Sequence, residues 1–301
     1  MRRIRRSRQK LDSRDWLFYG IVYTIIVLSL VVTVYPFLYV FSISLSSVDA
    51  INRKLVFLYP VHITVSGYQL VFRFSVIWKA YYNTIWYTAV GTLFNMVATC
   101  LAAYPLARRR FFLRRFLNFF IVFTMFFSGG LIPTYIVITS LGLYNSRWAM
   151  VVPVLLSTFY VLICRSAFET VPAEIFEGAS IDGANDLVIL ARIAVPLVKP
   201  TLAVLSLYYA IGHWNDFFNA LLYLGNTNLA PLQIYLRRIL LMASPEVMQQ
   251  ALLSASAATR AVSSLQVRYV SIVVSVVPII LAYPFVQKYF IRGILLGAVK
   301  G

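Results

Sequence analysis

Long apolar runs separated by short polar segments are the main pattern along this 301-residue chain. Six runs are each long enough to cross a bilayer core of roughly 30 Å as a helix that rises about 1.5 Å per residue. They cover about 17–45, 80–106, 116–139, 146–168, 196–224 and 268–290. The runs lack the alternation of a β-barrel strand, and lipid does not tolerate an unpaired backbone, so each run predicts a helix.

The predicted fold class is therefore an all-α polytopic membrane protein with six transmembrane helices. Its predicted parts are a basic tail at 1–16, a transmembrane domain at 17–290 that includes the loop 169–195, and a C-terminal tail at 291–301. Gly129, Gly130 and Pro133 interrupt the third run. We expect that helix to be kinked or locally unwound there.

Composition and charge agree with a membrane protein and give an orientation. Hydrophobic residues make up 60% of the chain and charged residues 12%, against about 25% charged in soluble domains. The formal net charge is +17, and in so apolar a chain such an excess is typical of membrane flanks rather than of nucleic-acid binding. Most of the 27 Lys and Arg residues lie in or beside 1–14, 108–115, 165–199 and 288–300, which predicts that both termini are cytoplasmic.

One short loop holds Arg108, Arg109, Arg110, Arg114 and Arg115. The simplest interpretation is a topological anchor, because basic residues concentrate in short cytoplasmic loops. A site for phosphate or for a lipid headgroup is the alternative.

Half of the ten carboxylates fall in one predicted cytoplasmic segment, and they are Glu169, Glu174, Glu177, Asp182 and Asp186. Thr170 as N-cap and Pro172 in the first turn predict a helix that runs to about Ile181. Asp182-Gly183 predicts a turn, and Asn185 could cap a second short helix that continues towards Arg192. Acidic residues contribute little to topology, so we expect this loop to contact a partner.

Residues 177–200 read Glu-Gly-Ala-x-x-Asp-Gly-Ala-x8-Ile-x-Val-Pro-x3-Pro. This pattern resembles the cytoplasmic "EAA" loop of bacterial ABC importer permeases. It differs from the commonest form at Gly178, where Ala is usual, and at Val195, where Leu is usual.

The resemblance implies the ABC importer type I permease fold and a loop that works as the coupling helix on a separate ATPase. Glu177 would pair with a basic residue of that ATPase. The ATPase, rather than this chain, would bind the ATP and Mg. The residues that the resemblance assigns to coupling are Glu174, Glu177, Gly178, Ala179, Asp182, Gly183, Ala184 and Pro196. The P-loop pattern G-x-x-x-x-G-K-[ST] does not occur in the sequence, so we expect no cofactor and no enzyme activity in this chain.

Other segments resemble the maltose-type carbohydrate permeases. They are Gly212–Phe218, with a Trp-Asn-acidic stretch, and the tail Gly293–Gly301, in which Gly297, Lys300 and Gly301 would reach the ATPase dimer. Phe127–Tyr135 and Pro231–Gln233 resemble the subgroup for larger oligosaccharides, some containing uronates such as alginate fragments. The partners implied are a second homologous permease, two ABC ATPases and an extracytoplasmic solute-binding protein, at the bacterial inner membrane.

Polar groups within the runs are candidates for a saccharide path, because sugars bind to aromatic faces together with amides and acids. These candidates are Asn83, Tyr87, Asn95, Tyr208, Gly212, Trp214, Asn215, Asp216 and Asn219. Hydrogen bonding between helices would explain the same pattern equally well. His62 and His213 are too few and too far apart in sequence to predict a metal site.

Three other functions remain as alternatives. Within the same family, the substrate could be an amino acid or a peptide. An ion-coupled carrier would be expected to have more intramembrane carboxylates than Asp216, and a membrane-embedded enzyme would need histidine or cysteine near its acids, which the 169–186 cluster lacks.

Overall fold

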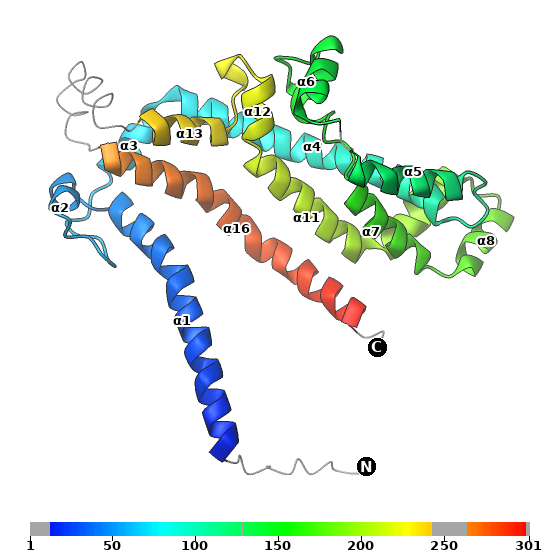
Figure 1. Cartoon of the computed structure of the whole chain (residues 1–301), viewed down its shortest axis with the longest axis horizontal. Coiled ribbons are helices and arrows are strands. Elements are labelled where there is room, and N and C mark those ends of the chain that lie inside the picture. The colour runs from blue at the N-terminus through cyan, green and yellow to red at the C-terminus, as the bar shows by residue number, and fades with distance from the viewer. Residues whose placement is uncertain (1–12, 128, 243–263, 299–301) are drawn as a thin grey trace. The chain divides into compact units, whose positions relative to one another are not determined.

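The computed structural model describes residues 13–127, 129–242 and 264–298, and every regular element in these ranges is a helix (Figure 1). The chain divides into two compact units. The first comprises Met1–Val71 with Ala243–Val273, and the second comprises Phe72–Met242 with Val274–Gly301.

The first unit contains one long exposed helix and a small core. Helix α1 (Ser13–Ser44) presents apolar side chains to the outside over most of its length, as expected of a helix that contacts lipid. Ser47 is the N-cap of the short helix α2 (Val48–Asn52), and its hydroxyl accepts from the Ala50 amide at 3.3 Å. The core contains Ile43, Ala50, Ile51 and Val56. Helix α3 (Ser66–Arg73) and helix α16 (Ser264–Ala298) each run from this unit into the second.

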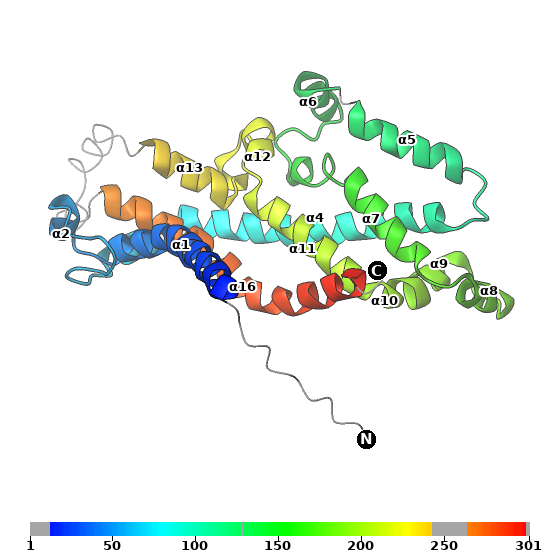
Figure 2. The ribbon, with the colours of Figure 1, turned by 60° about the horizontal axis from the view of Figure 1, so that its bottom comes forward.

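Helix α4 (Ser75–Ala107) is the central element of the second unit, and α7 (Thr158–Glu169) and α11 (Lys199–Asn215) pack along it (Figures 1 and 2). Their shared core is apolar and includes Cys100 and Leu106 of α4, Cys164 and Phe168 of α7, and Leu205 of α11. The other elements of this unit are α5 (Arg114–Phe126), α6 (Leu131–Ser140), η1 (Arg147–Met150), α8 (Ala173–Ile181), α9 (Asp186–Ile189), the π-helical η2 (Leu190–Ala194), α10 (Val195–Leu197), α12 (Phe218–Tyr223), η3 (Thr227–Leu229) and α13 (Leu232–Met242).

Some of the predicted spans are continuous helices and others are broken. Within the described ranges, Trp16–Ser44 and Ser75–Ala107 are long and apolar enough to cross a membrane, and counting each bent helix pair as one span gives up to four. The predicted interruption of the third run is confirmed, because α5 ends at Phe126 and α6 begins at Leu131, after Gly130 with a φ of +83°. The count of six spans stays a prediction.

The fourth and fifth runs differ from the continuous helices that the sequence predicts. In the fourth, the helix begins only at Thr158, because residues 151–157 form turns around Pro153, which has no N–H to donate. In the fifth, the chain bends by 88° between Asp186–Leu197 and Lys199–Asn215, and α11 then ends before Asp216. Non-helical backbone at membrane depth has to find hydrogen-bond partners inside the protein.

Candidate functional site

The segment from α8 to α9 forms the short helix, tight turn and second helix that the sequence predicts. At the turn, Gly183 has a φ of +80°, its amide donates to the Ser180 carbonyl at 3.2 Å, and the Ala184 amide donates to the Ala179 carbonyl at 3.0 Å. These two bonds make a Schellman motif, which ends α8. Asn185 then caps α9 by accepting from the Val188 amide at 2.9 Å.

One detail at the start of this segment was predicted wrongly. The N-cap of α8 is Pro172, whereas Thr170 is the C-cap of the preceding helix, α7. The Thr170 hydroxyl donates back to the Ala167 carbonyl at 2.7 Å. Threonine can bond to backbone on either side of itself, so the sequence does not reveal which helix it terminates.

Phe176 is the buried side chain with which helix α8 packs on the rest of its unit. Phe176 is 5% exposed, its ring lies edge-to-face with that of Tyr104 at 6.1 Å, and the Arg108 guanidinium lies 4.5 Å from its centroid. The other predicted coupling residues lie on the outside of the segment: Glu174, Glu177, Gly178, Asp182, Gly183 and Pro196 are exposed, and Ala179 and Ala184 are half-buried. The structure therefore gathers them on one accessible loop, apart from Pro196, which lies in α10.

Two features of this exposed face suit contact with another protein. A Cβ built on Gly178 would have no neighbour within 4 Å, so the chain's own packing does not require glycine at this position. Ile175, Ile181 and Leu187 are large apolar side chains that stay exposed here. Our sequence analysis did not select these three, although apolar residues between carboxylates in a polar loop are a usable signal for a protein interface.

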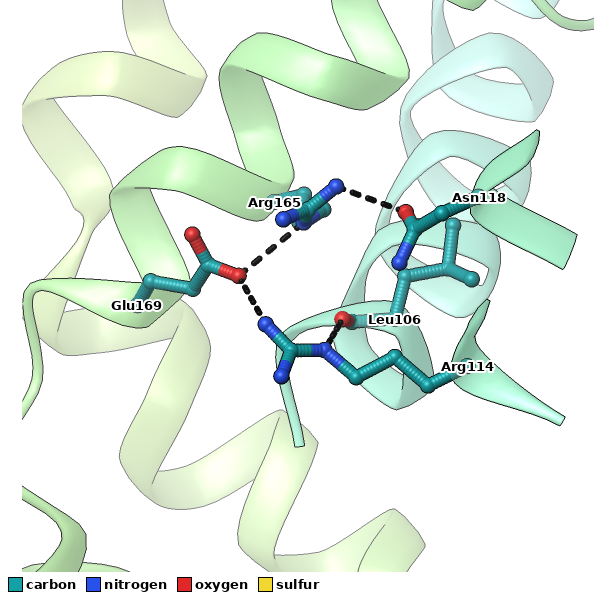
Figure 3. Close-up of polar contacts among 5 residues, drawn as sticks. All are labelled: Leu106, Arg114, Asn118, Arg165 and Glu169. Atoms are coloured by element: carbon teal, nitrogen blue, oxygen red, sulfur yellow. Dashed lines mark hydrogen bonds and ion pairs between the residues drawn. The ribbon is translucent and has the colours of Figure 1, made fainter. Parts of the chain in front are cut away.

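A network of ion pairs holds the base of the loop (Figure 3). The Glu169 carboxylate accepts from Arg114 at 2.7 Å and from Arg165 at 3.0 Å, and these three side chains are only 25–32% exposed. Arg114 also donates to the Leu106 carbonyl at 2.9 Å, and Arg165 donates to the Asn118 side-chain oxygen at 2.7 Å. The network joins the end of α4, the start of α5 and the end of α7, where the candidate coupling loop begins.

Glu177 itself has a partner within the chain. The nearest atoms of Arg110 and Glu177 are 3.6 Å apart, and both side chains are more than half exposed. An exposed pair at this separation stabilises a fold by at most about 1 kcal/mol. Glu177 can therefore exchange Arg110 for another cation at little cost.

A groove of about 500 Å³ lies at the junction of α11 and α12. The rings of Tyr160 and Tyr208 stack here with centroids 5.9 Å apart and planes 11° apart. The groove is lined by Pro153, Val154, Leu156, Ser157, Tyr160, Tyr208, Tyr209, Gly212, His213, Asp216 and Asn219. Four of the predicted path residues, Tyr208, Gly212, Asp216 and Asn219, thus meet at one place, whereas Trp214 and Asn215 do not line it.

Asp216 is held within this groove by Asn219. One carboxylate oxygen accepts from the Asn219 amide at 3.1 Å, and the other accepts from the Asn219 side-chain nitrogen at 2.8 Å. Tyr160 was missed in the sequence analysis. It lies in another apolar run, and nothing in the spacing of residues indicates which distant ring it stacks on.

The second-span candidates Asn83, Tyr87 and Asn95 are buried and bonded within the chain. Asn83 donates to the Asn228 carbonyl at 2.7 Å, and Tyr87 donates to the Leu229 carbonyl at 2.8 Å. These bonds favour the alternative in which polar groups join neighbouring segments. A role for these three residues in the path stays a prediction.

Asn95 contacts residues that line the groove. Its side-chain nitrogen donates to the carbonyls of Val154 and Leu155 at 2.6 and 2.8 Å, and its oxygen lies 2.6 Å from the His213 Nε2. Val154 and His213 both line the groove. Asn95 therefore supplies hydrogen bonds to the non-helical backbone after Pro153. It also holds two lining residues of the groove in place without lining the groove itself.

The two remaining questions about the site are metal binding and the position of the tails. Within 13–127, 129–242 and 264–298 there is no group of three or more His, Cys, Asp or Glu side chains that could hold a metal ion. Gly297 lies in the last turn of α16. Lys300, Gly301 and residues 1–12 of the basic tail lie outside the described residues.

Comparison with known proteins places the chain among transport proteins. A family model described as "binding-protein-dependent transport system inner membrane component" matches residues 95–296. The polygalacturonan/rhamnogalacturonan transport system permease protein YtcP of Bacillus subtilis (strain 168) is 36% identical over 288 residues, which is 96% of this chain and 100% of that protein. Protein LplC of the same organism is 37% identical over 275 residues, 90% of each chain.

Two solved structures are also similar. A chain of a bacterial ABC transporter involved in the import of the acidic polysaccharide alginate superposes with a TM-score of 0.86 at 36% identity, and the match covers 94% of this chain and 100% of that one. A chain of the alginate transporter in complex with an alginate pentasaccharide-bound periplasmic protein matches with a TM-score of 0.58 at 15% identity, covering 91% and 94%. The second likeness is one of fold alone.

Proposed function

The chain belongs to the family of binding-protein-dependent transport system inner membrane components, and from this premise we propose that it is a permease subunit of an ABC importer for an oligosaccharide. Relatives over 90% or more of the chain include a polygalacturonan/rhamnogalacturonan permease and a chain of an alginate importer. The observation that carries the proposal is the outward face of α8, where Glu177, Gly178 and Asp182 are exposed on a helix anchored by Phe176. Such a loop is built to be contacted from outside.

This geometry supports the proposal that the chain is coupled to a separate pair of ATPases. An ATPase that docks on the 173–184 loop would replace Arg110 as the partner of Glu177, and it would bind the ATP and Mg. Phe176 packs against Tyr104 of α4 and belongs to the same core as Phe168 of α7. A displacement of α8 would therefore move α4 and α7 as a rigid body, which is how packed elements transmit a switch.

The groove at the α11–α12 junction is the proposed saccharide path. The Tyr160 and Tyr208 rings offer apolar faces, and Asp216 and Asn219 offer hydrogen-bonding groups beside them. Carbohydrates are bound by such combinations. A second homologous permease would close the other side, and an extracytoplasmic solute-binding protein would deliver the sugar. The proposed arrangement has six spans in the bacterial inner membrane and both termini in the cytoplasm.

The proposal is tested by ATP-driven uptake in proteoliposomes that contain the chain with its co-purified partners. Labelled oligogalacturonides, neutral oligosaccharides and a peptide mixture serve as substrates. Wild type should take up oligosaccharide only with ATP inside the vesicles. Uptake of peptides alone would replace the substrate class, and uptake driven by a proton or sodium gradient without ATP would show an ion-coupled carrier.

Glu177→Lys tests the coupling step in the same vesicles. The reversed charge should abolish co-purification of the ATPase and the uptake that depends on it. Asp49→Lys is the matched control, because Asp49 is an exposed acid of the first unit that pairs with Arg53. If Glu177→Lys kept both the ATPase and full uptake, the assignment of α8 to coupling would be wrong.

A further inference from the structure

A groove in the second unit is rich in arginine. It has a volume of about 970 Å³ and lies between the loop after α4 and the candidate coupling loop. The charged side chains that line it are Arg108, Arg109, Arg110, Arg114, Arg165, Glu169, Glu174 and Glu177. The five guanidinium groups outnumber the three carboxylates, so the groove favours an anionic occupant.

Two of these arginines are held in place. Glu169 binds Arg114 and Arg165 together, and each of those guanidinium groups makes one further bond within the chain (Figure 3). A guanidinium carries five N–H donors on three nitrogens, and the bonds above use two nitrogens of each. Fixed guanidinium groups of this kind lose little side-chain freedom when they bind a phosphate.

The other arginines lie at the rim. Arg109 and Arg110 are exposed, and the ion pair of Arg110 with Glu177 is long and weak. Arg108 is half-buried beneath the α8 anchor, because its guanidinium lies over the ring of Phe176. The rim therefore adds two exposed positive charges, those of Arg109 and Arg110, beside a fixed pair.

Exposed apolar side chains follow the arginines of the groove along the chain, into α5. The loop that carries Arg108–Arg110 goes on to Phe112, which is 86% exposed, and α5 begins with Arg114 of the groove itself. The first two turns of α5 then expose Phe116, Phe119 and Phe120. Positive charge directly followed by exposed aromatic surface is typical of the interface between a membrane and water.

We propose that this groove binds the phosphodiester headgroup of an anionic phospholipid, whose acyl chains lie along the exposed phenylalanines of α5. A soluble phosphate would contact the arginines but not the aromatic surface, whereas a phospholipid would contact both. The acidic surface of a protein partner would match the arginines alone. The lipid site requires only that the arginine loop faces an anionic leaflet.

The site has a consequence for α8, and this consequence rests on the proposed function. A phosphodiester bound to Arg110 would compete with Glu177 for the same guanidinium. Glu177 would then be released from its 3.6 Å contact and become available to the ATPase. Anionic lipid would thereby raise the affinity of the permease for its ATPase.

Native mass spectrometry on the purified full chain tests the site without transport. The chain is mixed with phosphatidylglycerol or phosphatidylcholine of the same acyl composition, and the bound lipid is counted. The variant is the double substitution Arg109→Gln with Arg110→Gln, both exposed positions in the groove. The charge-matched control is Arg53→Gln with Lys54→Gln, which are also exposed but lie in the first unit.

Wild type and the control should retain phosphatidylglycerol over phosphatidylcholine, and the groove variant should lose about thirtyfold in phosphatidylglycerol affinity. That loss corresponds to about 1 kcal/mol per basic residue, with about 1.4 kcal/mol for each tenfold change. Equal binding of the two lipids, or equal losses in the two variants, would overturn the proposal. So would displacement of the lipid by millimolar inorganic phosphate alone, which would reveal a phosphate-ion site.

A pull-down of the ATPase distinguishes the remaining occupant. If the groove variant kept its bound phosphatidylglycerol but lost the ATPase, the arginines would serve a protein interface and the lipid site would be wrong. If lipid binding failed while ATP-driven uptake persisted in wild type, the proposed transport function would stand without it.

Discussion

The Nε2 of His213 lies 2.6 Å from the side-chain oxygen of Asn95, and this buried contact joins α11 to α4. The imidazole also covers Gly91, one turn before Asn95 on α4. Both helices border the α11–α12 groove or support it, so the pair sets the position of the groove's wall.

Gly91→Ala should destabilise the protein. A Cβ at this position would come within 2.8 Å of three atoms of the His213 ring, which cannot easily move while it is bonded to Asn95. Overpacking of this kind costs about 1–3 kcal/mol, so we expect a lower thermal unfolding midpoint in detergent. Gly20→Ala is the control, because a Cβ on that helical glycine has no neighbour within 4 Å. Equal midpoints for the two variants would contradict the predicted clash.

Asn95→Leu should be more damaging still. The substitution leaves the carbonyls of Val154 and Leu155 without their donor in residues 151–157, which form turns rather than a continuous helix. Each unsatisfied buried group costs about 1–3 kcal/mol. Asn215→Leu is the comparison, since the side-chain nitrogen of that exposed residue donates to a carbonyl of its own helix, that of Ile211, at 3.1 Å. Thermal unfolding of the two variants measures the difference, and similar midpoints would exclude a supporting role for Asn95.

Gly183 and Gly178 should respond differently to the same change. Gly183→Ala forces a side chain into a φ of +80° and should cost about 1–2 kcal/mol, whereas Gly183→Asn should recover part of the loss. Gly178→Ala meets nothing and should leave the isolated chain unchanged. Hydrogen exchange of the amides of residues 180–185 measures the stability of the turn. We expect faster exchange in Gly183→Ala alone. Faster exchange in Gly178→Ala would contradict the prediction that the chain's own packing does not require glycine at position 178.

Glu169→Gln should loosen the junction of α4, α5 and α7. The charge of Glu169 is shared by Arg114 and Arg165, and all three side chains are partly shielded from water. We expect a loss of about 1 kcal/mol at low salt that shrinks as salt is added. Asp49→Asn removes an ion pair whose side chains are 70% exposed and should have little effect. A loss independent of salt would show that packing, rather than charge, holds the junction.

Tyr208→Ala should reduce saccharide uptake while leaving the ATPase attached. Removal of one face of the stacked Tyr160–Tyr208 pair should cost about 0.5–1.5 kcal/mol of sugar binding, or roughly two- to tenfold in uptake at low substrate. Tyr59→Ala, an exposed aromatic of the first unit outside this groove, is the control. Unchanged uptake in Tyr208→Ala would remove the groove from the path.

The sequence predicted local features that depend on neighbouring residues. Pro172, the Asp182-Gly183 pair and Asn185 indicated a helix, a turn and a second helix, because caps and positive-φ turns involve residues only a few positions apart. Gly130 and its neighbours indicated the break between α5 and α6 in the same way. The acidic character of residues 169–186 was also recognisable from the pattern, since half of the ten carboxylates occur there.

The sequence by itself thus determined a helical membrane protein with an acidic helix–turn–helix loop, because hydropathy and capping act over one turn or one span. Only the tertiary structure decided that Asn95 satisfies the unwound backbone after Pro153, that Tyr160 stacks on Tyr208, and that Glu177 meets Arg110. These pairs are far apart in the chain. Which of many similar polar or aromatic groups come together depends on how α4, α7 and α11 pack, and packing is a property of the whole unit rather than of any local spacing.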